Sequence, residues 1–333
     1  MTKEERQLYK SGRKNPDGYI KIPIIFRIKY KKKIVALMTA LISFSIIINA
    51  LIYFNVFSVN TLYTKLGIIN GIEKQDSNFV VYYLDVGQSD CSIVTCDDMT
   101  MMIDTGTRVR YYEIKDALFA LGINQIDYLV VTHPHDDHMS NASDIIRNYN
   151  VKNIIMPKIS AENNVESLIY STLINTIAEY NVNPIAAASG DSFDFGSSSV
   201  KVIAPIKQNK NLNNMSLVLK IQYGETSFLF QGDVEENVEK EILNSDIDVS
   251  ADVIKIGHHG SNTSTGERYL IRVNPLFAVI SCGADNNFKH PNKQTIDTLD
   301  SNNVKTFITA YHGNITVISD GKSVDVLYEN KNV

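Results

Sequence analysis

The segment Thr132-His133-Pro134-His135-Asp136-Asp137-His138 carries three imidazoles and two carboxylates within six positions. It closes an apolar run, residues 128–131, that has the length and β-branched content of a buried strand. Imidazole and carboxylate together suit zinc, iron or manganese, and a metal site needs several ligands from one short, rigid segment. One histidine alone is usually an ordinary surface or core residue, but this spacing predicts a metal site at the end of a strand.

Polar groups elsewhere in the chain also come just after apolar, strand-like runs. In chain order, and with the first histidine of the cluster included, these groups are Asp85, Asp104, His133, Asp233 and His258. Ligands of α/β proteins gather at the ends of strands, so five separate strands are predicted to deliver these side chains to one place. Scattered surface residues would not show this regularity.

Strand-like runs alternate with helical patterns through residues 78–333. Helices are predicted over 108–121, about 142–149 and 165–180, the last from apolar residues that recur at the 3.6-residue period. The alternation predicts the α/β class, with a sheet that helices cover on at least one face.

The charges are unevenly distributed along the chain. Residues 1–33 carry eleven Lys/Arg against three Asp/Glu, and residues 34–57 carry no charged side chain. The remaining residues, 58–333, hold 21 basic and 34 acidic side chains, a net charge of −13. Proteins that grip duplex DNA normally use many Lys/Arg–phosphate contacts, so this acidic balance argues against a broad duplex-binding surface.

The uncharged block of 24 residues is long enough for a transmembrane helix, which needs about 20 apolar residues. The lysines directly before it favour a cytoplasmic N-terminus. We therefore predict a basic cytoplasmic tail (1–33), a single-pass transmembrane signal anchor in the cell membrane (34–57), a linker (58–77) and an extracytoplasmic domain (78–333). A cleaved signal peptide and a buried core helix are the alternatives. The long apolar core counts against the first and the flanking lysines against the second.

With these residues in hand, the sequence resembles the metallo-β-lactamase fold, and specifically the metallohydrolase domain of ComEC-type competence proteins, over about residues 78–330. The blocks that carry the resemblance are Asp85-Val86-Gly87-Gln88-Ser89-Asp90, Asp104-Thr105-Gly106, His133 to His138, Asn213-Asn214-Met215-Ser216-Leu217-Val218-Leu219, Gly232-Asp233-Val234-Glu235, Gly257-His258-His259-Gly260-Ser261 and His290-Pro291. Choline-phosphate esterases of bacterial surfaces are similar in the same blocks. The resemblance implies an αββα sandwich that holds two divalent metal ions, zinc or manganese.

Two departures from the family pattern stand out. Ser89 occupies a position where glycine is usual. ComEC-type domains are attached to a channel with many membrane spans, whereas this chain has one candidate span. It is therefore not expected to form a DNA uptake channel by itself.

The resemblance also implies a set of metal ligands. His133 and His135 are expected to bind one ion, and Asp137, His138 and His259 the second, with Asp233 bridging the two. Many relatives supply a third histidine to the first ion, but this chain has none between His138 and His258. The segment that contains Asn213 and Ser216 stands in its place, so the first ion is expected to be ligand-poor. That openness keeps manganese beside zinc as a candidate.

Other residues are expected to support the ligands or face the substrate. Asp85, Asp90 and Asp104 fit as acceptors that orient ligand imidazoles, and plain turn-forming carboxylates are the alternative. Neighbouring side chains of an extended segment point to opposite sides, which agrees with His258 facing the substrate while His259 binds metal. Asn213, Ser216 and His290 are candidates for contacts around the metal ions or the substrate.

The predicted reaction is attack of a metal-bound hydroxide on a phosphoester, because two ions about 3.5–4 Å apart can clamp an in-line displacement at phosphorus. Asp137 would orient the water, and His258 would protonate the leaving group or stabilise the phosphoryl oxygen. The predicted function is a membrane-anchored phosphodiesterase or nuclease, with DNA among the candidate substrates. The alternatives are a cell-envelope hydrolase of choline phosphate or another small phosphoester, and a non-catalytic partner in DNA handling.

Overall fold

The computed structural model describes residues 24–53, 72–159, 165 and 167–329. Residues 1–23 of the predicted tail, residues 54–57 of the predicted anchor and residues 58–71 of the predicted linker lie outside the described residues. The chain divides into two units, residues 1–59 and residues 60–333.

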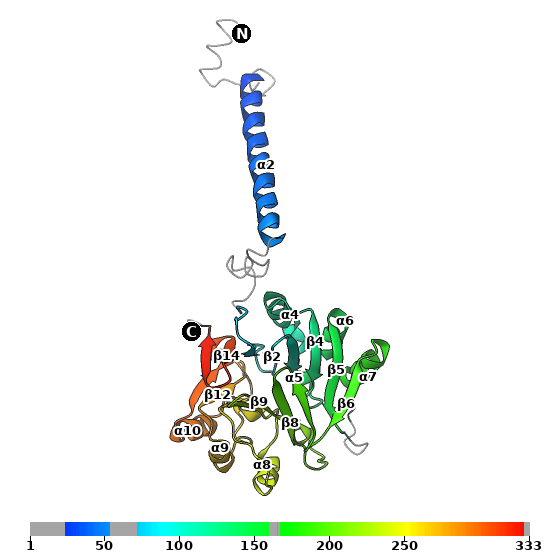
Figure 1. The fold of residues 1–333 in the computed structure, drawn as a ribbon, viewed down its shortest axis with the longest axis vertical. Helices are drawn as coiled ribbons and strands as arrows, with labels where there is room; N and C mark the ends of the chain where they lie inside the picture. Colours follow the sequence, from blue (N-terminus) through cyan, green and yellow to red (C-terminus); the bar gives the residue numbers. More distant parts are fainter. Residues whose placement is uncertain (1–23, 54–71, 160–164, 166, 330–333) are drawn as a thin grey trace. The chain divides into compact units, whose positions relative to one another are not determined.

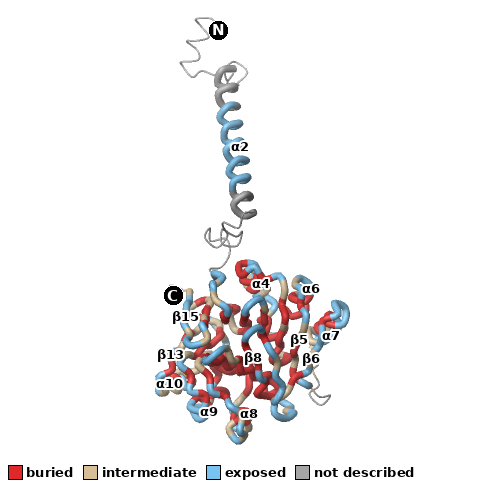
Figure 2. The backbone as a smooth tube through the Cα atoms, in the orientation of Figure 1, coloured by how far each residue is buried: buried red, intermediate tan, exposed pale blue. Residues whose placement is uncertain are grey.

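The first unit contains the helix α2, Ile24–Tyr53, which is 30 residues long (Figure 1). Its described side chains, residues 32–47, are all exposed (Figure 2). Within the part of the chain that the structure describes, no helix meets the length and apolarity needed to span a membrane.

The second unit is built on two β-sheets. The first has eight strands. In spatial order they are β15 (Val324–Tyr328), β14 (Ile315–Ser319), β1 (Phe79–Tyr83), β2 (Ser92–Cys96), β3 (Met99–Ile103), β4 (Gln125–Val130), β5 (Asn150–Pro157) and β6 (Asn183–Ala187). From β3 to β6 the pairs are parallel, and β1 runs in the same direction because β1–β2 and β2–β3 are both antiparallel. The chain therefore leaves β1, β3 and β4 at the same edge of this sheet.

The second sheet has seven strands. In spatial order they are β13 (Lys305–Ile308), β12 (Phe277–Ile280), β11 (Val253–Lys255), β10 (Thr226–Phe230), β9 (Val218–Tyr223), β8 (Ser198–Ala204) and β7 (Ser192–Phe195). Strands β10 to β13 are parallel, so the chain leaves β10, β11 and β12 at one edge. The strand ends of the second sheet can thus face those of the first.

Three hydrophobic clusters define the layers. One cluster joins side chains from the facing sides of both sheets, such as Tyr83 and Phe230, whose rings lie 5.8 Å apart. A second packs helices against the outer face of the first sheet, and a third packs helices against the outer face of the second (Figure 1). Figure 2 shows that buried residues gather at the centre of this unit and that exposed residues lie mainly at its periphery. This is the predicted αββα order of layers.

The helices of this unit lie between the strands in sequence. They are α4 (Tyr111–Ala120), α5 (Asp136–Met139), α6 (Ala142–Asn148), α7 (Leu168–Glu179), α8 (Glu236–Leu243), α9 (Glu267–Val273), α10 (Lys293–Ser301) and α11 (Thr309–His312). The first sheet carries α4, α6 and α7, and the second carries α8, α9 and α10. The predicted helix 165–180 is shorter in the structure, where Ser167 caps α7 by accepting a hydrogen bond from the backbone N–H of Tyr170.

Strand β6 was not predicted from the sequence, which indicated only the helix 165–180 before it. Pro184 lies inside β6, and proline is found in sheets on edge strands because it cannot donate to the ladder. β6 is the edge strand beside β5. Only the assembled sheet provides the partner that makes this short, proline-containing segment a strand.

Candidate metal centre

The histidine segment leaves β4 and turns at once into the short helix α5. His133 and His138 are buried, while His135 and Asp137 are partly exposed. Asp137 and His138 belong to the first turn of α5, so their side chains project from a fixed helical backbone. The segment therefore presents ligand atoms from a rigid frame rather than from an extended loop.

Asp233 is the group around which the imidazoles gather. Its Oδ2 atom lies 3.3 Å from Nε2 of His138, 3.8 Å from Nε2 of His258, and 3.9 Å from Nε2 of both His133 and His259. Asp233 follows β10, whereas His133 follows β4, so the group joins the two sheets. A single buried carboxylate oxygen therefore faces four imidazole nitrogens, the arrangement expected of a bridging ligand.

Four potential ligand atoms form a tight group. One atom each of Asp137, His138, Asp233 and His259 lies within 4.8 Å of all the others, and Nε2 of His259 is 3.2 Å from Oδ2 of Asp137. His138 Nε2 and Asp233 Oδ1 are buried without a hydrogen-bond partner among the described residues. Buried polar atoms are normally satisfied, so two unsatisfied ligand atoms in one group fit a metal ion that completes them.

The charges of this group also suit a cation. Burial alone would lower the pKa of His138, but the carboxylates of Asp233 and Asp104 hold that pKa well above its usual value. Burial likewise acts to lower the pKa of His259, and Asp233 and Asp90 raise it to about 10. A cluster that draws protons onto two buried imidazoles draws a divalent cation for the same electrostatic reason.

His133 and His135 form a separate pair beside this group. Nε2 of His133 lies 3.0 Å from Nδ1 of His135, close to the separation of roughly 3 Å expected for two nitrogens on one ion with bonds of about 2.0–2.1 Å. Asp233 is the only carboxylate with a described contact to His133. An ion on this side would meet two imidazoles and the shared carboxylate.

Ser216 and Asn213 act differently from each other. The hydroxyl of Ser216 accepts a hydrogen bond from the backbone N–H of Asp233, so it positions the bridging residue. Gly232, at φ +53°, places its Cα so close to Ser216 that an added Cβ would lie 2.8 Å from the serine Cβ. Oδ1 of Asn213 is buried and has no hydrogen-bond partner among the described residues. Ser216 therefore supports the metal centre through the 232–233 turn.

Asp104 orients His138 as predicted for an acceptor. Its Oδ2 lies 2.8 Å from Nδ1 of His138 and accepts a hydrogen bond from the hydroxyl of Thr132. Its Oδ1 accepts a hydrogen bond from the backbone N–H of Thr132. A carboxylate on the far nitrogen of a ligand imidazole fixes the tautomer, so that Nε2 is left to face the metal. Thr132 was not among the predicted site residues, although it stands directly before the histidines.

Asp90 contacts His259 and also Lys255, a residue that the sequence analysis did not single out. Its Oδ1 lies 3.4 Å from Nδ1 of His259 and 3.0 Å from Nζ of Lys255, and both partners are buried. Nδ1 of His259 also lies 3.0 Å from the carbonyl oxygen of Ser281. Lysine is rarely buried unless paired, so the single lysine inside the apolar run 252–256 was the available signal.

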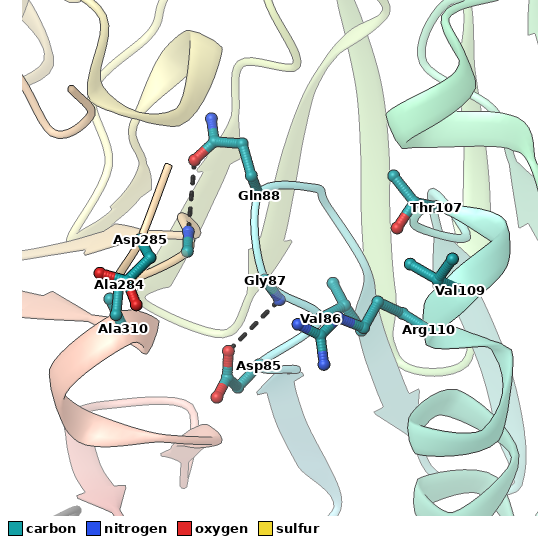
Figure 3. Close-up of a pocket in the computed structure, with 11 residues that line it drawn as sticks. Asp85, Val86, Gly87, Gln88, Thr107, Val109, Arg110, Ala284, Asp285 and Ala310 are labelled. Atoms are coloured by element: carbon teal, nitrogen blue, oxygen red, sulfur yellow. Dashed lines mark hydrogen bonds between the residues drawn. The ribbon is translucent and has the colours of Figure 1, made fainter. Parts of the chain in front are cut away.

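Asp85 follows the alternative interpretation, that of a turn-forming carboxylate. Its Oδ1 accepts a hydrogen bond from the backbone N–H of Gly87, two residues along the chain. Asp85 also lines a cavity of about 500 Å³ with Gln88 and Arg110 (Figure 3). In Figure 3 the side chain of Arg110 points toward the Asp85–Gly87 turn, and Gln88 points away to accept from the backbone N–H of Gly283.

The backbone at His258 and His259 corrects one premise of the sequence analysis. The segment is not extended: both residues are left-handed, with φ of 50° and 53°, inside the turn Gly257–Gly260. His259 is buried with Nε2 toward Asp137 and Asp233, whereas the side chain of His258 keeps 24% of its surface exposed. Nδ1 of His258 contacts the hydroxyl of Thr263 at 3.2 Å. The two rings thus separate because of the left-handed turn.

His290 lies beside this pair. Its ring centroid is 5.8 Å from that of His258, and its Nδ1 contacts Nε2 of Gln88 at 3.2 Å. Burial and the neighbouring His259 and His258 lower the pKa of His290 to about 4. A neutral imidazole at this place can accept or donate a hydrogen bond toward a substrate held near His258.

A cavity of about 720 Å³ opens beside the candidate metal ligands. His135, Asp136 and Asp137 form its polar side, and Leu168, Ile169 and Leu212 are among the apolar residues that line it. The candidate ligands His135 and Asp137 are therefore reachable from solvent, whereas His133, His138 and Asp233 are enclosed.

Comparison with known proteins agrees with this geometry. The model of the metallo-beta-lactamase superfamily matches residues 84–284. The ComE operon protein 3 of Bacillus subtilis (strain 168) is 29% identical over 252 residues, which cover 70% of this chain and 32% of that protein. The competence protein ComA of Neisseria gonorrhoeae is 25% identical over 233 residues, which cover 69% and 30%. The chain thus spans about a third of the length of these relatives.

Among solved structures, CmlA, a diiron beta-hydroxylase from Streptomyces venezuelae, is similar in fold. Its TM-score is 0.50 at 15% sequence identity, over 74% of this chain and 55% of that chain. The curated relatives are consistent with the resemblance to ComEC-type competence proteins. The family match over most of the folded unit, with its ligand blocks gathered at one place, shows that the chain belongs to the metallo-beta-lactamase superfamily.

Proposed function

We propose that the domain is a binuclear metal-dependent phosphodiesterase that acts on nucleic acid. The observation that carries this proposal is the position of Asp233, whose Oδ2 lies within 3.9 Å of both His133 and the His138–His259 side of the centre. One shared carboxylate between two groups of ligands suits a pair of ions, the arrangement used for displacement at phosphorus. The ligand-poor His133–His135 side leaves room for a phosphoryl oxygen.

When bound, two divalent ions would supply an activated water and neutralise charge on the phosphoryl group. The protein's own groups then have separate tasks. Asp137 is partly exposed next to the cavity and positions the nucleophile on the open side of the centre. His258 is partly exposed and can donate a proton or hydrogen bond to the leaving oxygen.

The similarity to competence proteins favours a nucleic-acid substrate. The net charge of −13 over residues 58–333 argues against tight binding of duplex DNA and so favours single strands. A test uses the full chain with manganese or zinc, and compares single-stranded DNA, duplex DNA, bis-p-nitrophenyl phosphate and p-nitrophenyl phosphorylcholine. We expect the DNA substrates and bis-p-nitrophenyl phosphate to be hydrolysed only with added metal. Single-stranded DNA should be hydrolysed faster than duplex DNA. Turnover of the choline ester alone would replace this proposal with a small-phosphoester hydrolase.

We also propose that residues 34–57 anchor the chain in the cell membrane, with the domain on the outer side. The support is the uncharged block, the lysines before it and the exposed apolar side chains of α2, such as Ile34, Leu41 and Ile47. Protease added to intact spheroplasts is expected to remove the domain. If the domain is degraded only after lysis, the proposed topology is wrong. The proposal that the substrate lies outside the cytoplasm is then wrong as well.

A further inference from the structure

An exposed aromatic ring stands beside the metal centre. Phe288 lies in the loop that follows β12 and keeps 68% of its surface exposed. Its ring stacks on His290, with centroids 5.7 Å apart and planes inclined by 26°. One face of the phenyl ring is therefore in contact with a residue of the site.

The contact continues a row of rings from the buried ligands to the surface. His138 and His259 lie 5.3 Å apart between centroids, His259 and His290 6.4 Å, and His290 and Phe288 5.7 Å. Phe288 is thus only two ring contacts from a predicted metal ligand. A substrate group that rests on Phe288 would be the neighbour of a group that reacts at the centre.

The loop is built to hold this ring in place. The side chain of Asn286 donates to the carbonyl oxygens of Gly283 and His290, and it accepts from the backbone N–H of His290. These three hydrogen bonds tie the two ends of the loop to each other. Phe288 is therefore presented by a constrained turn, and binding to it costs little ordering entropy.

The charge of the domain indicates which kind of ligand would bind at Phe288. The excess of acidic over basic side chains, a net charge of −13 over residues 58–333, disfavours binding through many contacts to a phosphate backbone. Stacking of bases on aromatic rings gives affinity for single strands without such contacts, and every base offers a π-face. The exposed Lys289 follows Phe288 and can contact one phosphate.

From these observations we infer that Phe288 is a stacking site for a nucleobase of an unpaired strand, whose adjoining phosphodiester lies at the metal centre. The inference rests on the proposed phosphodiesterase function and narrows its substrate to single-stranded nucleic acid with exposed bases. Paired bases inside a duplex offer no free face, so duplexes would bind here only through frayed or unpaired ends.

The test compares an oligothymidylate with the same strand made abasic throughout, using the full chain. Affinity is measured before metal is added, so that no strand is cleaved, and kcat/KM is measured with manganese. For Phe288→Ala we expect about 5- to 150-fold weaker binding of the intact strand, and little change for the abasic strand. Phe288→Trp should restore binding, while Phe288→Leu, which keeps an apolar contact to His290 without a planar face, should not.

A matched control is Tyr180→Ala. Tyr180 is 45% exposed and precedes β6, at the sheet edge opposite the ends of the parallel strands, so its loss should leave both strands unaffected. Equal effects of Phe288→Ala on intact and abasic strands, or none on either, would overturn the inference. Binding is measured without turnover, so the two proposals can fail separately. If the chain hydrolyses no phosphodiester, the proposed function is refuted, but the binding measurements still test the role of Phe288.

Discussion

Replacing Asp233 with Ala is expected to remove bound metal and turnover together. Its Oδ2 faces the imidazoles of both groups of ligands, so the variant loses the shared carboxylate and leaves buried imidazoles facing one another. Loss of a residue that merely orients a ligand typically costs about 10–100-fold in metal affinity or activity, so loss of the shared ligand should cost more than about 100-fold. Metal content by elemental analysis and hydrolysis of bis-p-nitrophenyl phosphate measure the two effects.

Asp136→Ala is the matched control for this experiment. Asp136 carries the same charge beside Asp137, but its side chain is exposed and lies outside the group of four ligands. The control should keep both ions and most activity. A wild-type protein with one ion and full activity, or an Asp233→Ala variant that keeps two ions, would reject the binuclear arrangement.

The second large effect separates His258 from His259. His259→Ala is expected to lower metal occupancy and abolish turnover, because its Nε2 lies within the group of four ligands. His258→Ala is expected to keep the ions and still lose about 10²- to 10⁴-fold in rate, the usual cost of one well-placed acid or hydrogen-bond donor. Elemental analysis beside steady-state kinetics distinguishes the two outcomes.

The leaving group identifies what His258 does. A p-nitrophenolate leaves without protonation, so a p-nitrophenyl ester should recover much of the rate of His258→Ala if His258 is the general acid. Little recovery would instead indicate charge stabilisation at phosphorus. The assignment fails if His258→Ala loses metal while His259→Ala retains it, and the two roles would then be exchanged.

Several features of the site could be predicted from the sequence because they depend on local sequence patterns. Asp104, His133 and Asp233 each follow an apolar run, and chain leaving parallel strands at one edge must bring such residues together. The α/β class and the layer order follow from the same alternation of elements. The turn at His258 and His259 was not predicted, since left-handed φ at two successive non-glycine residues has no simple sequence signal.

Which side chains can serve as ligands follows from the sequence, because their chemistry and their places after the strands do not depend on distant parts of the chain. How these side chains are supported depends on contacts that form only in the folded protein. The pairing of Lys255 with Asp90, the stacking of Phe288 on His290 and the turn-forming role of Asp85 join or place groups through burial and close approach. Lys255 and Asp90 are 165 residues apart in the chain, and the energy of their buried pairing depends on desolvation that no local pattern encodes.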